Sequence, residues 1–163
     1  MKNSLKQISK NTKGITLMAL VITIVLLLIL ASISVYSGVN VVKSSRFTRF
    51  TAELKIMQTH INEMYQKYTD GGSVDVGGNT YTGEEILNIG KDISSTQDVT
   101  DQANKVFTSG ESGITDKTGY KYFDLQTIKD LNIEGVEGEF FINVQKRSIV
   151  SYDGFNYENG MYY

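Results

Sequence analysis

The sequence predicts an α+β protein in which a long N-terminal helix, membrane-spanning in its first half, packs against a small C-terminal head. Two observations predict the helix: an uncharged run between Lys13 and Lys43, and a single helical stripe of apolar residues after it. A third observation concerns the chain from Gly138 onward, where short runs of β-type residues alternate with turn residues. These runs predict a three- to four-stranded antiparallel sheet in the head.

Charge is divided sharply along the chain. Residues 1–52 include seven Lys or Arg and no acidic residue, whereas residues 53–163 carry nine basic and 18 acidic residues. This acidic body argues against binding of nucleic acid by charge. Because the chain has no Cys and one His, disulfides, Fe–S clusters, catalytic thiols and multi-His metal sites are excluded, and we expect no cofactor.

Residues 15–37 are predicted to cross a membrane as the first half of the helix. Only Thr16, Thr23 and Ser32 interrupt the apolar residues from Ile15 to Ile33, and such hydroxyls can bond to the preceding helical turn. A span of ~20 apolar residues crosses a hydrocarbon layer of ~30 Å. A cleaved signal peptide is the alternative, with a small-residue site at residues 31–34, although its apolar region would be only ~7–15 residues long.

The lysines before this span predict its orientation. Lys2, Lys6, Lys10 and Lys13 precede the apolar segment, and the positive-inside bias of the first span places the N-terminus in the cytoplasm. The C-terminal domain is then extracellular, on a single-pass membrane protein.

The run from Lys13 to Leu17, Lys-Gly-Ile-Thr-Leu, follows a short basic leader and precedes the apolar segment. It resembles the processing site of type IV pilins and type II secretion pseudopilins, in a variant similar to that of Gram-positive, clostridia-like bacteria. The resemblance extends from the N-terminus to about Phe50 and does not reach the C-terminal half. It implies that residues 1–14 are a prepilin leader, that prepilin peptidase cleaves between Gly14 and Ile15, and that Ile15, in the place of the usual Phe, becomes N-methylated.

Ala19 departs from this family pattern, which has a glutamate at that position. The resemblance implies that such a glutamate answers the N-terminal ammonium of a neighbouring subunit during assembly. Ala19 cannot make that pair, which favours a tip, initiator or other minor subunit, or a lineage that assembles differently.

Residues 38–68 are predicted to continue the helix outside the membrane, with one apolar face. The face carries apolar residues at helical spacing: Phe50, Leu54, Met57, Ile61, Met64 and Tyr68. A coiled coil with a partner helix is one way to cover this stripe. Cover by the chain's own C-terminal half is favoured, because that half lacks another long helix to pack on.

Lys43, Arg46 and Arg49 are predicted to form a basic rim just beyond the membrane span. Their spacing of three residues keeps them near one side of a helix. Contact with anionic lipid headgroups is the functional interpretation. An ordinary solvated rim is the alternative.

Residues 69–163 are predicted to form the globular head. Gly71 and Gly72 end the long helix, Thr82 and Glu85 form a capping box before a short helix that closes near Gly90, and Asp124 caps another helix. The other expected elements are a strand at 74–76, a helix at 97–107, a loop at 109–119, a helix face formed by Leu125, Ile128 and Leu131, and strands at 140–144, 148–152, 155–157 and 161–163.

No catalytic residue and no metal ligand are assigned. His60 lacks an evident partner and is interpreted as a residue at the edge of the apolar stripe. Glu134, Glu137 and Glu139 lack the spacing of an EF-hand and are interpreted as solvated charges before an edge strand. We therefore expect a protein that is not an enzyme.

The sequence thus predicts a prepilin-like structural subunit, a minor pilin or pseudopilin, at a type IV pilus or type II secretion-like filament on the cell surface. The expected partners are prepilin peptidase, other pilin-like subunits that contact the N-terminal helix, and membrane lipid. The alternative is a single-pass, membrane-anchored extracellular binding or adhesion module that never polymerises.

Overall fold

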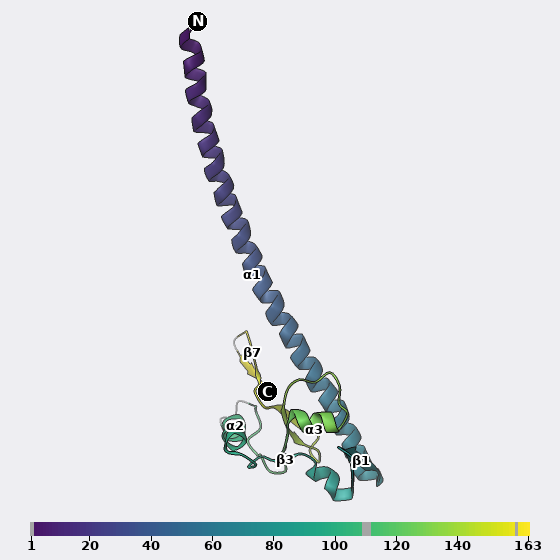
Figure 1. Ribbon diagram of the computed structural model, residues 1–163. Helices are drawn as coiled ribbons and strands as arrows, with labels where there is room; N and C mark the ends of the chain where they lie inside the picture. Colours follow the sequence, from purple (N-terminus) through teal and green to yellow (C-terminus); the bar gives the residue numbers. More distant parts are fainter. Residues whose placement is uncertain (1, 109–111, 159) are drawn as a thin grey trace. The chain divides into compact units, whose positions relative to one another are not determined.

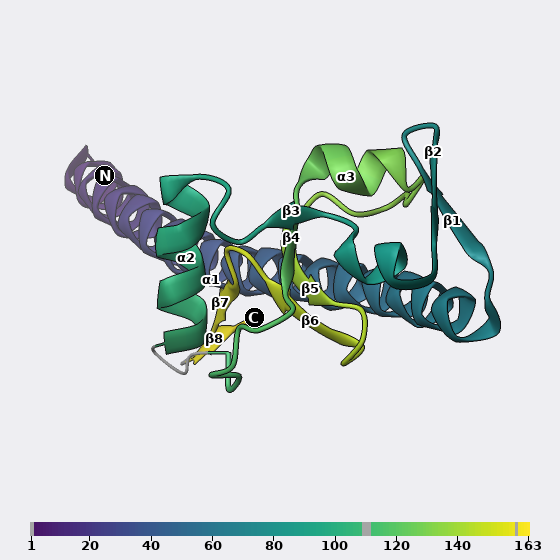
Figure 2. The ribbon, with the colours of Figure 1, turned by 90° about the horizontal axis from the view of Figure 1, so that it is seen from below.

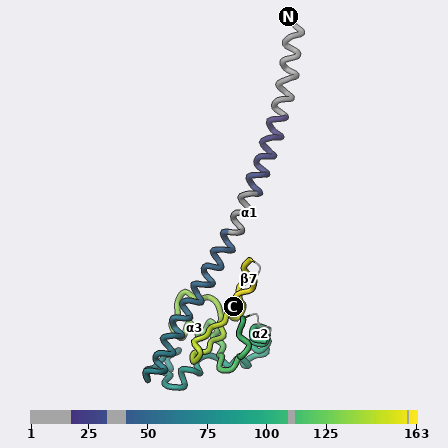
Figure 3. The backbone as a smooth tube through the Cα atoms, turned by 180° about the vertical axis from the view of Figure 1, so that it is seen from behind, coloured from purple at the N-terminus to yellow at the C-terminus, as the bar shows by residue number. Residues whose placement is uncertain are grey.

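The chain divides into two compact units in the computed structural model, residues 1–45 and residues 46–163. The backbone is described for residues 2–108, 112–158 and 160–163, and side chains for residues 18–32, 41–108, 112–158 and 160–163 (Figures 1 and 3). The class is α+β, with an N-terminal helical region and a C-terminal antiparallel sheet domain.

Helix α1 comprises Lys2–Asp70 and supplies residues to both units. The prediction of one continuous helix over 15–68 is confirmed, and the helix also includes residues 2–14. Its end has the predicted glycine cap: Gly71 has φ +73°, and the N–H of Gly72 donates to the carbonyl of Lys67 at 2.7 Å. This pairing is a Schellman motif, in which glycine adopts the left-handed conformation at low cost.

Residues 18–32 of α1 expose apolar side chains on all sides of the helix. The hydroxyls of Thr23 and Ser32 donate to the carbonyls of Leu20 and Leu28, at 2.8 and 2.7 Å, so the predicted bonding to the preceding turn is confirmed for both. Across the part of the chain that the structure describes, no helix combines the length and the apolar character needed to cross a membrane. The predicted span 15–37 extends at both ends beyond the described stretch 18–32.

A four-stranded antiparallel sheet forms the centre of the head (Figure 2). Its strands, in spatial order, are β3 (Lys91–Asp92), β4 (Lys121–Phe123), β5 (Phe140–Asn143) and β6 (Ser148–Ser151). The predicted pairing of the 140–144 and 148–152 runs is confirmed, with Phe141 opposite Val150. All four residues of β5 are buried, because both faces of the sheet are covered.

One face of this sheet packs on the apolar stripe of α1. Met57 and Ile61 are each 1% exposed, and they share a core with Phe140 and Ile142 of β5. The prediction that the chain's own C-terminal half covers the stripe is therefore confirmed. This burial fixes the Arg46–Asp70 part of α1 in the head.

The other face packs on α2 (Gln97–Thr108), which the sequence predicted over 97–107. Val106 and Phe107 of this helix are fully buried against Phe141 and Val150. The sheet thus lies between α1 and α2 (Figure 1).

Shorter elements complete the head. Thr82 and Glu85 form the predicted capping box, with the N–H of Thr82 donating to Glu85 Oε2 at 3.0 Å, and Asp124 accepts from the N–H of Thr127 at 2.9 Å. The remaining elements are β1 (Ser73–Val76), β2 (Asn79–Thr82), the 3₁₀ helix η1 (Gly83–Asn88), α3 (Leu125–Asp130), β7 (Phe155–Tyr157) and β8 (Gly160–Tyr162). Residues 112–119 form the expected loop, and residues 109–111 of that prediction lie outside the described residues.

Two sequence predictions about the head are wrong. The sequence places the four C-terminal runs in one sheet, but β7 and β8 form a separate two-stranded sheet, while β3 and β4 from the middle of the chain complete the main one. The sequence also places Leu125 on the same helix face as Ile128, yet Leu125 is 51% exposed while Ile128 is buried. Helix α3 has fewer than two turns, so the periodicity could not define its face.

Candidate functional site

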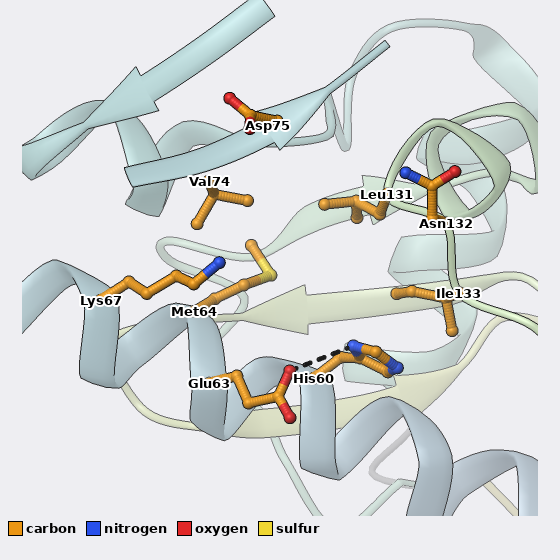
Figure 4. A pocket seen from close by; sticks show the side chains of 9 residues that line it. All are labelled: His60, Glu63, Met64, Lys67, Val74, Asp75, Leu131, Asn132 and Ile133. Carbon is orange, nitrogen blue, oxygen red and sulfur yellow. Dashed lines mark ion pairs between the residues drawn. The ribbon is translucent and has the colours of Figure 1, made fainter. Parts of the chain in front are cut away.

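A hollow on the side of α1 is a partly enclosed concave site (Figure 4). Its volume is about 270 Å³. The lining residues come from one side of α1, from β1 and from the segment after α3: His60, Glu63, Met64, Lys67, Val74, Asp75, Leu131, Asn132 and Ile133. The α1 members recur at helical spacing, which is why they face the same hollow.

This hollow is lined by both apolar and charged side chains. Met64 and Ile133 are buried, while His60 Nδ1 lies 3.4 Å from Glu63 Oε2 and Asp75 accepts a hydrogen bond from the hydroxyl of Thr80 at 2.6 Å. His60 lies at the edge of the stripe, as predicted, but the sequence reasoning missed Glu63 as its partner. The position of Glu63, three residues further along the helix, was the available signal.

The chemistry-bearing groups of the hollow are two carboxylates, one imidazole and one ammonium. Within the described ranges, no three His, Cys, Asp or Glu residues lie close enough together to hold a metal ion. No Ser or Cys is among the lining residues to pair with His60 as a nucleophile and base.

A buried carboxylate connects α1 to the segment before β5. Glu53 is 8% exposed, and its Oε2 accepts from the N–H groups of Glu137 and Gly138 at 3.3 and 3.1 Å. Its Oε1 accepts from Arg49 Nε at 3.0 Å. Arg49 also pairs with the carboxylate of Glu137, and its hydrogen bonds to Glu137 and Glu53 raise the pKa of Arg49.

The residues of the predicted basic rim therefore differ in whether they form ion pairs. Lys43, Arg46 and Arg49 are all exposed on α1, but Arg49 is held by Glu53 and Glu137. Arg46 makes no ion pair with any residue that the structure describes. Of the two arginines of this rim that belong to the head, Arg46 is therefore the one whose guanidinium can contact an external anion.

The other predicted site residues lie in the N-terminal unit. Gly14 and Ile15, the predicted processing site, fall outside the residues whose side chains are described. Ala19 is described and exposed on α1, in the stretch 18–32, which carries no charge.

Glu137 and Glu139 have specific partners and β5 is not an edge strand, so for these two residues the interpretation as solvated charges before an edge strand is wrong, while Glu134 is exposed. Strand β5 lies between β4 and β6, and Glu137 pairs with Arg49. Glu139 accepts from the hydroxyl of Tyr122 at 2.7 Å. Burial raises the pKa of Tyr122, and this bond to the carboxylate raises it further.

Aromatic side chains join the C-terminal hairpin to the start of the head helix. The hairpin β7–β8 carries Tyr157, whose ring stacks on Phe47 with centroids 4.3 Å apart, and Phe155, which stacks on Phe50 at 5.4 Å. Tyr162 meets the edge of Phe47 at 5.2 Å. We call these five residues the aromatic rim. The sequence predicted strands at 155–157 and 161–163 but not the surface on which they dock.

Comparison with known proteins gives no match to a family model, a curated protein or a solved structure.

Proposed function

We propose that this chain is a prepilin-like structural subunit, a minor pilin or pseudopilin. Prepilin peptidase would process it, and α1 would join it to other pilin-like subunits of a type IV pilus or type II secretion-like filament. Before assembly it would be a single-pass membrane protein with its head outside the cell. The proposal assigns it no catalytic role and no cofactor.

The observation that carries this proposal is the exposed apolar surface of α1. Eleven large apolar side chains between Met18 and Leu30 are between 48% and 67% exposed, all around the helix. A helix that is apolar on every side requires a lipid or protein environment. The hydroxyls of Thr23 and Ser32 bond within the helix, so this stretch offers no unpaired side-chain group to lipid.

Processing is tested by the intact mass of the chain purified from cells with an active prepilin peptidase. We expect the wild-type chain to lack residues 1–14 and to begin at a methylated Ile15. Gly14→Val should remain full length, because the larger side chain obstructs the cut, while Gly38→Val should be processed normally. A wild-type chain that still begins at Met1 would contradict the proposal.

The position in a filament follows from Ala19. A subunit without a carboxylate there cannot answer a neighbour's N-terminal ammonium, so we expect a few copies at the tip or initiation point. Deletion should reduce filament number more than filament length. Quantitative mass spectrometry of sheared filaments measures the copy number, and a dominant share for this chain would contradict the tip assignment.

A second candidate is a membrane-anchored binding module that never polymerises. Ala19 favours it, because an uncharged apolar helix can anchor the head without any subunit pairing. In that case the chain would stay in the membrane fraction and be absent from the sheared filaments.

A further inference from the structure

The aromatic rim and Arg46 form one surface of the head. We propose that this surface is a seat for anionic membrane lipid, with Arg46 contacting the lipid phosphate and the hairpin side chains lying at the headgroup level. The proposal rests on the membrane anchorage proposed above. It adds the β7–β8 hairpin, which the sequence did not connect with the membrane.

The exposed residues of the hairpin suit a membrane–water boundary. Tyr162 is 45% exposed and Met161 is 41% exposed. Tyrosine has an apolar ring and a polar hydroxyl, and it is enriched where the hydrocarbon layer meets water. Methionine adds flexible apolar surface beside it.

Ring stacking holds the hairpin next to Arg46. Among the described strands, β7 and β8 pair with each other and with no third strand, so side-chain contacts rather than a shared sheet fix their place. Phe47, which follows Arg46 in the chain, lies 4.3 Å from the Tyr157 ring and 5.2 Å from the Tyr162 ring. Arg46 itself lines a cavity together with Phe155 of the same hairpin.

A cavity of about 320 Å³ opens at this surface. Arg46, Phe50 and Phe155 are among the residues that line it, together with the Arg49–Glu53–Glu137 group. Glu53 and Glu137 both pair with Arg49, so Arg46 is the cation without an ion pair to any described residue, in a lining whose two cations and two carboxylates balance. An anion entering the cavity would meet the Arg46 guanidinium in a lining that also includes Phe50 and Phe155.

The charge distribution selects lipid as the occupant. Residues 53–163 carry twice as many acidic as basic residues, so an anionic membrane repels most of the head. The chain has no acidic residue before Glu53, and an uncharged run from Gly14 to Val42 precedes Lys43. The end of the head that contains Arg46 is continuous in sequence with this acid-free, apolar segment.

The absence of tryptophan from the chain gives a clean fluorescence test. Full-length Tyr162→Trp is reconstituted in vesicles of phosphatidylglycerol and phosphatidylcholine in equal parts, with brominated acyl chains as the quencher. We expect a blue-shifted emission that brominated lipid quenches about twofold, because the ring lies at the lipid boundary. Leu125→Trp, at a position 51% exposed on α3, is the matched probe and should show no quenching.

Arg46→Gln in the Tyr162→Trp chain tests the cation. We expect quenching in the mixed vesicles to fall to the level seen in pure phosphatidylcholine. Lys55→Gln removes the same charge from another exposed position of α1 and should leave the quenching unchanged.

Three other outcomes would distinguish failure of the membrane anchorage from failure of the lipid seat. A chain that fails to float with the vesicles would overturn the membrane anchorage itself. A Tyr162→Trp chain that floats while its indole is unquenched would overturn the lipid seat and leave the anchorage intact. An emission shift that follows protein concentration and ignores brominated lipid would overturn the seat in favour of an interface between copies.

Discussion

The carboxylate of Glu53 is expected to stabilise the head through two backbone N–H groups, more than through its ion pair with Arg49. It is 8% exposed, and its Oε2 accepts from Glu137 and Gly138. Hydrogen bonds to charged groups contribute ~1.5–3 kcal/mol each when well made. The bond from Glu137 is longer, at 3.3 Å, than the bond from Gly138 at 3.1 Å, so we expect the Gly138 bond to contribute more.

Glu53→Ala should therefore reduce the free energy of unfolding by about 2 kcal/mol, most of it from the N–H of Gly138 left without an acceptor. Glu53→Gln retains one oxygen acceptor and should cost about half as much. Arg49→Gln should have a smaller effect than either, because the arginine side chain is 54% exposed and solvent screens its pair.

Urea unfolding of the full chain in detergent micelles measures these differences. Near-UV circular dichroism reports on the head, since nine of the ten tyrosines lie at or after Tyr65. Glu63→Gln is the control, because its side chain is 59% exposed on the same helix, and we expect no measurable change. If Arg49→Gln proves the most destabilising variant, or Glu53→Ala matches the wild type, the assignment to backbone N–H groups is wrong.

Three further predictions concern the head. Ile61→Ala should cost ~2–4 kcal/mol of unfolding free energy in the same assay, because the side chain is 1% exposed, while Leu125→Ala should change it by less than ~0.5 kcal/mol. Residues 46–163 expressed alone should give a dispersed NMR spectrum, since both cores lie within this unit; a collapsed spectrum would contradict that. Burial alone would raise the pKa of Asp124, but its hydrogen bonds to Lys91 and Thr127 lower that pKa below the ordinary value. Asp124 therefore stabilises the head above the pKa of the unfolded chain, ~3.9, and this contribution is lost as the pH falls through the lower pKa of the folded protein. Asp124→Asn should accordingly lose less stability than the wild type between pH 5 and pH 2, measured by urea unfolding; equal losses would contradict this.

Local chemistry determined which parts of the fold could be predicted. The α1 stripe and the Phe140–Val150 hairpin follow from periodicity and a short turn, and the caps at Gly71 and Asp124 follow from residue type. Strands β3 and β4 have two and three residues, too few to show alternation. The hairpin β1–β2 turns at Gly77 and Gly78, both with positive φ; the sequence indicated this turn and the strand before it, but not the partner strand β2.

The candidate site was harder to predict because its contacts join distant segments. The Arg49–Glu137 pair and the stacking of Phe47 on Tyr157 connect residues about ninety to one hundred and ten positions apart. Sequence spacing predicts neighbours within one helix or hairpin, such as His60 and Glu63, but not which loop reaches a helix face. The basic rim could therefore be located, while the loss of Arg49 to an internal pair could not.

Helix α1 is continuous, yet its two parts derive their stability from different surroundings. Met57, Ile61 and Met64 are buried by the sheet, so the part within residues 46–70 is stabilised by the folding of the head. The exposed apolar side chains of residues 18–32 contact no core cluster among the described residues, so the surroundings of this stretch determine its stability. Substitutions in the two stretches should consequently affect different properties. Ile61→Ala should lower the free energy of unfolding without changing vesicle flotation. Leu26→Asn should weaken flotation without changing the free energy of unfolding of the head. A single substitution that altered both properties would show that the two parts of α1 depend on each other.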